Sequence, residues 1–469
     1  MTRYDQALAR LGERGPGRML PDLDRITALC ALLADPQDTY PSIHVTGTNG
    51  KGSVVRMATR LLHELDLGVG TYTSPHLQDV RERLAAYGHL IPRDAFADQV
   101  ELVDRLARLV DEPHEDRADH VTYFEFLTAM AFAWFAEVPV DVAVVEVGMG
   151  GRWDATNVVR GEVGVVTTID RDHAELGDTP AAIAREKSGI IKPGSILVTG
   201  DQDAAVMSVL AQTAQAAGAE WWRAGEHFAV EDQQAGVGGQ RLELRVGERV
   251  IDDIFLPALG DHQADNAAVA LAAAAAFLGE AWDSVDDDLV RSALGGVRLP
   301  GRLEKVGSDP SVFIDGAHNP HGALAVADAI GRFVRPRSTI LAFGCLRDKP
   351  PRQLLEALAP VVQHVVIAEP PAERATPLDE MVASAREVFA GTGIAVEAAS
   401  SLDDAVELAT GIAGPGDIVL ATGSLYVAGA VRDRYLPVDE TLHMVAPLDD
   451  GDDEEEHEPS DDPEFDEPF

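Results

Sequence analysis

The stretch IHVTGTNGKGSVVRMATRLL, from Ile43 to Leu62, decides how this chain folds. A short apolar run leads into a glycine-rich turn, and a segment of helical character follows at once. Backbone N–H groups in such a turn point at an anion, and the N-terminus of the helix adds partial positive charge. Gly47, Gly50 and Gly52 let a phosphate approach the backbone closely. The stretch therefore predicts a phosphate-binding loop between a buried strand and a helix.

Two side chains of this loop carry the chemistry that a nucleotide needs. Lys51 can reach the terminal phosphates, and the hydroxyl of Ser53 can ligate Mg²⁺. The loop is nevertheless two residues shorter than the common G-x-x-x-x-G-K-[ST] pattern, and Gly52 stands where Ser or Thr is usual. A tight structural turn without a ligand is therefore the alternative. The predicted nucleotide-binding residues of the loop are Asn49, Gly50, Lys51, Gly52 and Ser53.

Around this loop, short β-branched runs alternate with helical segments, which predicts a parallel α/β sheet. The expected strands are Ile43–Thr46, Asp141–Val147, Val163–Ile169 and Ser195–Thr199, and the expected helices are Ser53–Asp66, Tyr123–Glu137 and Ala181–Lys187. Residues 228–254 are rich in β-formers and turns, which indicates a meander. Asp261–Leu278 is alanine-rich and predicts a buried helix.

A second alternation begins near Ser311, so the chain is expected to hold two α/β domains. Its strand candidates are Val312–Ile314, Thr339–Phe343, His364–Ala368 and Asp417–Ala421. The glycine- and proline-containing run GGVRLPGR separates the halves and is typical of a linker. We predict a P-loop NTPase-like parallel-sheet domain at 1–296, a linker at 297–304, a smaller Rossmann-like α/β domain at 305–437 and an acidic disordered tail at 438–469.

The charge of the chain excludes some partners. Its 469 residues carry 38 Lys and Arg against 79 Asp and Glu, a formal net charge of −41. Such a surface repels nucleic acids and anionic lipids, so neither a nucleic acid nor a membrane is expected as a partner. No run approaches the roughly 20 apolar residues of a membrane helix, and the charged N-terminus does not resemble a signal peptide. Two distant cysteines, Cys30 and Cys345, fit a reducing cytoplasm.

Polar side chains at successive strand ends form a candidate metal site. Ser53 and Ser74 offer hydroxyls, Glu146 ends an apolar strand, and His173 follows another. Loops at the carboxyl edge of one sheet can bring such groups together around a divalent ion. A structural hydrogen-bonding role is the alternative for Glu146, and a structural role is the alternative for His173.

The segment VTYFEFLTAMAFAWF, from Val121 to Phe135, opens with a capping box. Thr122 and Glu125 have the S/T-x-x-E spacing in which two side chains satisfy the first turn of a helix. The residues alone support a helix start. They leave a ligand-binding role open.

Several motifs in this order resemble those of the bifunctional dihydrofolate synthase/folylpolyglutamate synthase family. That family belongs to the ADP-forming amide ligases, which also include the Mur ligases, and the resemblance extends from Leu20 to Leu436. The motifs are TGTNGKGS at 46–53, TSPHL at 73–77, EVGMGGRWDATN at 146–157, DHAELG at 172–177, REKSGIIK at 185–192, HQADNA at 262–267, PGR at 300–302 and DGAHNP at 315–320.

The resemblance implies roles for the matching residues. Ser74, Glu146 and His173 would bind Mg²⁺, and Lys187 would be carbamylated by CO₂. From the residues alone, Lys187 is a cation at a helix C-terminus. Asn266, Arg302, Asp315 and His318 would contact ATP. The acceptor site would include Thr122, Tyr123, Phe124, Glu125, Trp153, Asp154 and Ala155. Trp153 departs from the smaller residue expected at its position, which puts substrate preference in question.

The implied reaction joins L-glutamate to dihydropteroate and to the γ-carboxyl of reduced folates. ATP would activate the acceptor as an acyl phosphate, with Lys51, Lys187 and His318 as catalytic residues and a monomeric cytoplasmic enzyme as the setting. A Mur-type peptidoglycan-precursor ligase uses the same chemistry, but the loop at Gly47 leaves little chain upstream for a nucleotide-sugar domain. A non-catalytic nucleotide-dependent folate-binding regulator is the other alternative.

Overall fold

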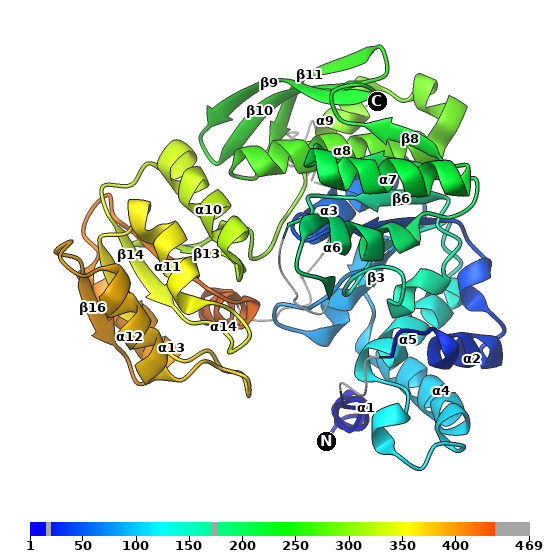
Figure 1. The fold of residues 1–469 in the computed structure, drawn as a ribbon, viewed down its shortest axis with the longest axis horizontal. Coiled ribbons are helices and arrows are strands. Elements are labelled where there is room, and N and C mark those ends of the chain that lie inside the picture. The colour runs from blue at the N-terminus through cyan, green and yellow to red at the C-terminus, as the bar shows by residue number, and fades with distance from the viewer. Residues whose placement is uncertain (16–19, 171–175, 437–469) are drawn as a thin grey trace, which may run out of the picture.

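The computed structural model describes residues 1–15, 20–170 and 176–436, and its two large sheets lie in separate lobes (Figure 1). The first sheet has eight strands in the order β4-β3-β2-β5-β1-β6-β7-β8. The six strands from β2 to β8 pair in parallel, and β3 and β4 pair antiparallel at one edge. The strands are β1 (Ser42–Thr46), β2 (Val69–Tyr72), β3 (Leu84–Ala86), β4 (His89–Leu90), β5 (Val142–Glu146), β6 (Val163–Val166), β7 (Ile196–Thr199) and β8 (Glu220–Arg223).

Helices cover both faces of this sheet, because its central strands are apolar on both sides. In β5, Val142 and Val144 pack into one core, and Ala143 and Val145 pack into the other. The first core lies under α3 (Lys51–Glu64), α8 (Asp261–Leu278) and α9 (Asp287–Gly295). The second core lies under α1 (Arg3–Gly12), α2 (Asp24–Leu32), α4 (Arg93–Asp111) and α5 (Tyr123–Glu137). Helices α6 (Pro180–Lys187) and α7 (Ala204–Ala217) pack beside β6 and β7.

Helix α8 is the predicted alanine-rich core helix. With the turn that follows it, to Ser284, it is long and apolar enough to span a membrane, but 67% of its apolar window is buried inside the protein. Its alanines from Ala267 to Ala276 belong to the first core, so burial within the fold accounts for the composition.

A three-stranded antiparallel sheet lies at the edge of this lobe, as the sequence predicted. It consists of β9 (Phe228–Gly236), β10 (Gly239–Val246) and β11 (Arg249–Leu256) in the order β11-β10-β9. Leu242, Leu244 and Ile254 pack against α8, which fixes this small sheet to the main domain.

The second lobe is a six-stranded sheet in the order β12-β13-β17-β14-β15-β16, parallel except for β12. Its strands are β12 (Glu304–Ser308), β13 (Ser311–Ile314), β14 (Thr339–Phe343), β15 (His364–Ile367), β16 (Ala395–Ala398) and β17 (Ile418–Thr422). One face is covered by α10 (Pro320–Ala329), α11 (Pro351–Leu358) and α12 (Leu378–Val388), and the other by α13 (Leu402–Ile412) and α14 (Leu425–Tyr435). The segment 297–304, here named the hinge segment, joins the lobes.

Two predicted boundaries near the phosphate loop were wrong for related reasons. The strand expected at 163–169 ends at Val166, because Thr167 and Thr168 turn to bond the loop in place of a neighbouring strand. The helix expected to begin at Ser53 begins at Lys51, because Gly50 adopts a φ of 89° and serves as its N-cap. As a result, Thr167 and Thr168 bond to the phosphate loop, and the helix begins directly after Gly50.

Candidate active site

The phosphate loop is held in shape by the end of β6. The N–H of Thr48 donates to the carbonyl of Thr168 at 2.8 Å, and the hydroxyl of Thr167 donates to the carbonyl of Asn49 at 2.7 Å. A side chain on Gly47 would overlap the hydroxyl of Thr167, and its φ of 152° favours glycine. The loop is therefore a preformed turn whose geometry depends on glycine.

The ammonium of Lys51 folds back over this turn. Its Nζ donates to the carbonyl oxygens of Gly47 at 3.0 Å and Thr48 at 3.3 Å. Lys51 is only partly buried, so its charge remains available to a group that settles on the loop.

A small cavity beside the loop gathers residues that lie far apart in the sequence. Three of the four predicted metal ligands, Ser53, Ser74 and Glu146, line it together with Arg302. His173, the fourth, lies outside the described residues. The remaining lining residues include Gly52, Arg56, Thr73, Pro75, Leu77, Glu82, Leu299, Pro300 and Leu425. Loops after β1, β2 and β5 thus meet the hinge segment at one point.

The carboxylate of Glu146 is buried at this point. Burial raises its pKa above the usual value, and the nearby Lys51 ammonium, the Ser74 N–H and the Arg302 guanidinium oppose that shift. One of its oxygens accepts a hydrogen bond from Ser74 N at 3.0 Å. A buried carboxylate surrounded by cations and N–H groups is suited to ligating a divalent cation.

The hydroxyl of Ser53 gives a second sign that this cavity is built for a ligand. Its oxygen is fully buried and makes no hydrogen bond to any described residue. Buried polar atoms are normally satisfied, so an unsatisfied one marks a missing partner. Among the described residues no three His, Cys, Asp or Glu side chains cluster, and the oxygen ligands that this cavity offers are the hydroxyls of Ser53 and Ser74 and the carboxylate of Glu146.

Lys187 reaches the phosphate loop from the opposite side. It is buried at the end of α6, and its Nζ donates to the carbonyl of Gly47 at 2.7 Å. Two lysines, Lys51 and Lys187, therefore bond to the same carbonyl oxygen. The helix C-terminal position predicted from the residues alone is confirmed, since Lys187 is the last residue of α6, and its side chain is buried inside the domain.

Arg302 stands between the two lobes. A Cβ on Gly52 would lie 4.0 Å from its Nη2, and a Cβ on Gly316 would lie 2.8 Å from its Nη1. The preceding turn places it there, since Gly301 and Leu303 have positive φ angles of 65° and 42°. A guanidinium in this position can neutralise charge that develops between the lobes.

The D-G-A-H segment supports this turn from the second lobe. Asp315 is buried and accepts hydrogen bonds from Leu303 N and Ala317 N, both at 2.7 Å. Burial raises its pKa, and the Arg302 guanidinium opposes the shift. The Nδ1 of His318 lies 2.9 Å from the carbonyl oxygen of Gly316. Asp315 thus fixes the hinge segment through its backbone.

The predicted nucleotide-contact residue Asn266 lies against the phosphate loop. A Cβ on Gly50 would lie 2.5 Å from its Oδ1, and its Nδ2 donates to Gln263 at 3.2 Å. On the other side of the loop, Asn49 bonds to Asn319 and to His321 at the start of α10. The loop is therefore bordered by both lobes.

Several side chains of the predicted acceptor segment make contacts within the fold. The capping box of Thr122 and Glu125 is confirmed, and Glu125 also accepts from Arg25 Nε at 3.0 Å. Phe124 packs on the loop after β5, where a Cβ on Gly148 would lie 2.5 Å from its ring. Tyr123 lies under the Arg83 guanidinium, 5.6 Å from the ring centroid. Aromatic rings and the loop after β5 therefore meet, as an acceptor site requires.

The residues of the R-W-D-A run differ in their exposure to solvent. Trp153 is 45% exposed, whereas Asp154 and Ala155 are buried. Asp154 accepts from Met149 N and Thr156 N, and its pKa is raised because burial outweighs these bonds. Asp154 thus holds the loop that Phe124 touches, and Trp153 faces outward.

Sequence reasoning missed two participants. Arg56 is a half-buried cation that lines the cavity of Glu146, and desolvation lowers its pKa. It lies three residues after Ser53 on α3, a spacing that puts both on one helix face and could have revealed it. His321 contacts Asn49, and no local pattern indicated this because the partner lies 272 positions away.

Comparison with known protein families shows that the chain contains two domains of the Mur ligase class. Residues 45–274 match the Mur ligase middle domain, and residues 301–425 match the glutamate ligase domain of Mur ligases. The second match begins within the hinge segment, at residue 301.

Comparison with individual relatives identifies the family within this class. The dihydrofolate synthase/folylpolyglutamate synthase of Mycobacterium tuberculosis is 42% identical over 451 residues, which cover 91% of this chain and 92% of the relative. The solved structure of Mycobacterium tuberculosis folylpolyglutamate synthase with ADP has a TM-score of 0.87 at 41% identity, covering 92% of this chain and 98% of that one. An FPGS–AMPPCP–folate complex has a TM-score of 0.80 at 32% identity, covering 92% and 99%. The chain belongs to the dihydrofolate synthase/folylpolyglutamate synthase family.

Proposed function

We propose that this chain ligates L-glutamate to dihydropteroate and to the γ-carboxyl of reduced folates, and converts ATP to ADP and phosphate. The observation that carries the proposal is the single cavity where Ser53, Ser74, Glu146 and Arg302 meet beside the phosphate loop. The names of the relatives and the nucleotide and folate in their solved complexes support it.

The nucleotide would lie on the phosphate loop, with its phosphates toward Lys51. Backbone N–H groups from Asn49 to Ser53 would hold the phosphates, and Asn266 would contact the nucleotide beside Gly50. Arg302, Asp315 and His318 would complete the site from the hinge segment and the second lobe. Lys51 and Arg302 are both close enough to Glu146 to lower its pKa, so both cations would serve the transferring phosphate.

Ser53, Ser74 and Glu146 would hold Mg²⁺, with His173 as a further ligand. The unsatisfied hydroxyl of Ser53 and the buried carboxylate of Glu146 fit a hard cation that prefers oxygen ligands. Bound Mg²⁺ neutralises charge on the phosphate oxygens. The Ser74 N–H orients the carboxylate of Glu146 toward the loop.

The ligation would proceed in two displacements. An oxygen of the acceptor carboxylate attacks the γ-phosphorus, the bond to the ADP oxygen breaks, and an acyl phosphate forms. The neutral amine of glutamate then attacks the acyl carbon, an amide forms, phosphate leaves, and the amine proton passes to a base or to solvent. Lys51 and Arg302 stabilise the charge on the transferring group, and His318 is the candidate catalytic histidine of the second lobe.

Carbamylation of Lys187 is part of the proposal. Two ammonium groups bonding to one carbonyl oxygen repel each other, and the low-dielectric site strengthens that repulsion. After the Lys187 ammonium loses one proton to solvent, its neutral amine would attack the carbon of CO₂ and release a second proton. The product is a carbamate anion with one N–H left for the bond to Gly47. The neighbouring Lys51 would then pair with it favourably. A carbamate signal in ¹³C NMR after incubation with ¹³CO₂ would reveal this group, and its loss in Lys187→Ala would assign it.

The acceptor would lie near Tyr123, Phe124 and the loop that Asp154 holds. Thr122, Glu125 and Ala155 shape this region through the helix cap and the buried loop. Trp153 is exposed and would contact a substrate only at the rim of the site.

The organisation of the chain is also proposed here. The ATP- and folate-binding domain would span 1–296, the hinge segment 297–304 and the ligase domain 305–437. The tail predicted at 438–469 lies outside the described residues. A monomer in the cytoplasm would be the active form.

One assay tests the proposal. The protein is incubated with ATP, Mg²⁺ and L-glutamate, with either dihydropteroate or tetrahydrofolate as acceptor, and ADP and glutamylated products are measured. Formation of ADP and product in equal amounts with both acceptors supports both activities. ADP formation that needs a UDP-sugar acceptor would support a Mur-type ligase, and turnover that ignores every acceptor would overturn ligation.

A further inference from the structure

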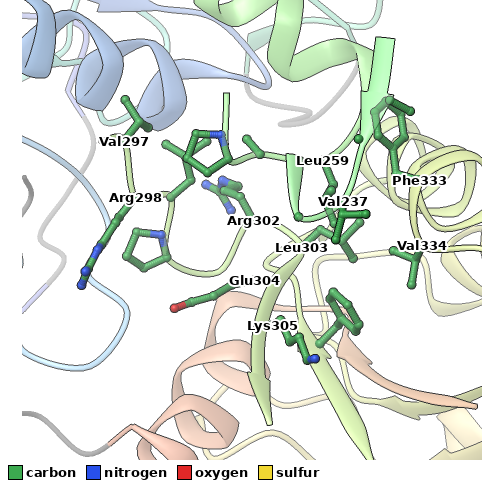
Figure 2. A pocket seen from close by; sticks show the side chains of 18 of the residues that line it. Val237, Leu259, Val297, Arg298, Arg302, Leu303, Glu304, Lys305, Phe333 and Val334 are labelled. Atoms are coloured by element: carbon green, nitrogen blue, oxygen red, sulfur yellow. The ribbon is translucent and has the colours of Figure 1, made fainter. Parts of the chain in front are cut away.

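A cavity of about 910 Å³ lies on the other side of the hinge segment from Glu146. Leu299, Pro300 and Arg302 line both cavities, so the hinge segment separates them. The larger one is here named the hinge pocket. It is lined by the turn between β9 and β10, the chain after β11, residues 332–335 after α10, and the end of α14. In Figure 2, Val237, Leu259 and Phe333 lie across from Arg298.

The charge of the hinge pocket is opposite to that of the whole chain. Acidic residues outnumber Lys and Arg by 79 to 38 in the sequence. In the pocket the only acidic lining residue is Glu304, against six cations: Arg298, Arg302, Lys305, Arg332, Arg335 and Arg432. An anion therefore meets a local positive potential here, on a chain whose net charge is negative.

Four of these six cations form no ion pair with an acidic residue among the described residues, and one of the four, Arg302, also lines the cavity of Glu146. Arg432 pairs with Glu304, and Arg332 pairs with Asp261. Three others, Arg298, Lys305 and Arg335, are exposed and form no ion pair within ranges 1–15, 20–170 and 176–436. They come from the hinge segment, β12 and the turn after α10, so the unpaired charge is spread around the pocket.

The lining also has apolar walls. Val237, Leu259, Val297, Leu303 and Phe333 line the pocket between the cations, and Val237 is completely exposed. A compact anion such as phosphate needs donors that converge on one point. Separated cations with apolar surface between them suit a chain whose carboxylates are spaced by methylene groups.

We propose that the hinge pocket is a second ligand site, which binds a polycarboxylate chain. Several carboxylates would pair with Arg298, Lys305 and Arg335, and the intervening methylenes would lie on the apolar walls. A ligand there would contact both lobes and the hinge segment at once.

Two polycarboxylate chains are candidate ligands of the hinge pocket. One is the chain itself: Leu436 lines the pocket, and the following residues 437–469 contain 15 Asp and Glu and no Lys or Arg. The other is a free oligo-γ-glutamate, a source that rests on the proposed function. Binding to the hinge pocket is measured without ATP. A negative result in the ligase assay therefore does not decide whether the pocket binds a polycarboxylate chain.

The test is calorimetric titration with penta-γ-L-glutamate at low salt. It compares the full chain with a full-length variant whose 13 acids from Asp449 to Glu467 are changed to amides. Equal binding to both assigns the site to free ligand, and binding that appears or strengthens in the amide variant assigns it to the acidic segment. Absence of binding to both at millimolar concentration would overturn the proposal.

The location is tested in the chain that binds the probe. The triple variant R298Q/K305Q/R335Q should bind at least tenfold more weakly. The matched control is Arg337→Gln, which removes an exposed cation two residues from Arg335 that does not line the pocket. Equal affinity in the triple variant and the parent would place the probe elsewhere. None of the three residues belongs to the proposed ATP site, so ADP formation with a monoglutamate acceptor should stay within twofold.

Discussion

The side-chain amides of Asn49 and Asn319 are within hydrogen-bond reach in both directions. Asn319 Nδ2 donates to Asn49 Oδ1 at 3.0 Å, and Asn49 Nδ2 lies 3.4 Å from Asn319 Oδ1. One residue belongs to the phosphate loop and the other to the second lobe, 270 positions later. This pair is a direct polar link from the nucleotide-binding loop to the ligase domain.

Two substitutions separate the roles of Asn319. Its Oδ1 also accepts from Gly322 N at 2.8 Å and caps α10. Asn319→Ala should lose about 1 kcal/mol of unfolding free energy through the cap. Asn319→Asp should keep the cap and lose only the donor to Asn49. Denaturant unfolding checks stability, and ATP titration of turnover should show a higher KM in both variants. Equal destabilisation by both would argue against the cap as the cause.

Lys51→Ala should abolish ADP formation and leave the fold intact. The Lys51 ammonium donates to the loop carbonyls of Gly47 and Thr48, so its loss removes charge at the phosphates more than packing. We expect kcat/KM to fall at least 1,000-fold, about 4 kcal/mol of transition-state stabilisation. Circular dichroism and thermal unfolding serve as the control. Turnover near that of the parent would refute the loop assignment.

Ser53→Ala should separate ligand binding from stability. The Ser53 hydroxyl has no hydrogen bond to lose in the described structure, so unfolding without Mg²⁺ should change by less than about 0.5 kcal/mol. The Mg²⁺ concentration for half-maximal ADP formation should rise at least tenfold, about 1.4 kcal/mol. A large loss of stability with an unchanged Mg²⁺ requirement would assign Ser53 a structural role.

The free energy of unfolding should fall as the pH is lowered, because the unfolded state takes up a proton on His76 more readily than the folded state does. Burial and then the Arg83 guanidinium lower the pKa of His76 to about 4, and its Nδ1 accepts from Arg83 Nε at 2.9 Å. The unfolded state binds its proton near pH 6.5, so this contribution is fully present above that pH. It is lost as pH falls toward 4, by at most about 1.4 kcal/mol per pH unit.

His76→Asn keeps an acceptor for Arg83 but cannot take up this proton. Denaturant unfolding between pH 7 and 4 should therefore show a shallower decline for the variant than for the parent. Parallel curves would mean that other groups, such as His262 with its pKa lowered to about 4, account for the acid sensitivity.

Gly429→Ala should weaken the contact between the lobes. A Cβ at this position of α14 would overlap the carbonyl oxygen of Leu77, on the loop that carries Ser74. The clash should cost about 1–3 kcal/mol and lower turnover. Gly411→Ala is the matched control, because it lies in α13 with nothing within 4 Å and should gain stability through helix propensity. If both substitutions stabilise the protein, the lobes do not need this close approach.

Local features were well predicted from the sequence. The loop at 47–51, the capping box of Thr122 and Glu125, and the central strands of both sheets are present as expected. Each depends on residues within a few positions, where φ preferences, capping bonds and apolar runs act directly. The shifted strand end at Val166 shows the limit, because bonds from Thr167 and Thr168 to the phosphate loop decided it.

The sequence by itself determined the chemistry that is present: a phosphate loop, hydroxyl and carboxylate ligands, and a cationic linker. Only the tertiary structure decided which of these groups meet. Strand order places the loops of Ser53, Ser74 and Glu146 together, and the turn at Leu303 aims Arg302 at them. The exposure of Trp153 and the unpaired cations of the hinge pocket are equally tertiary. Such proximity depends on long-range packing and domain arrangement, which short sequence patterns do not encode.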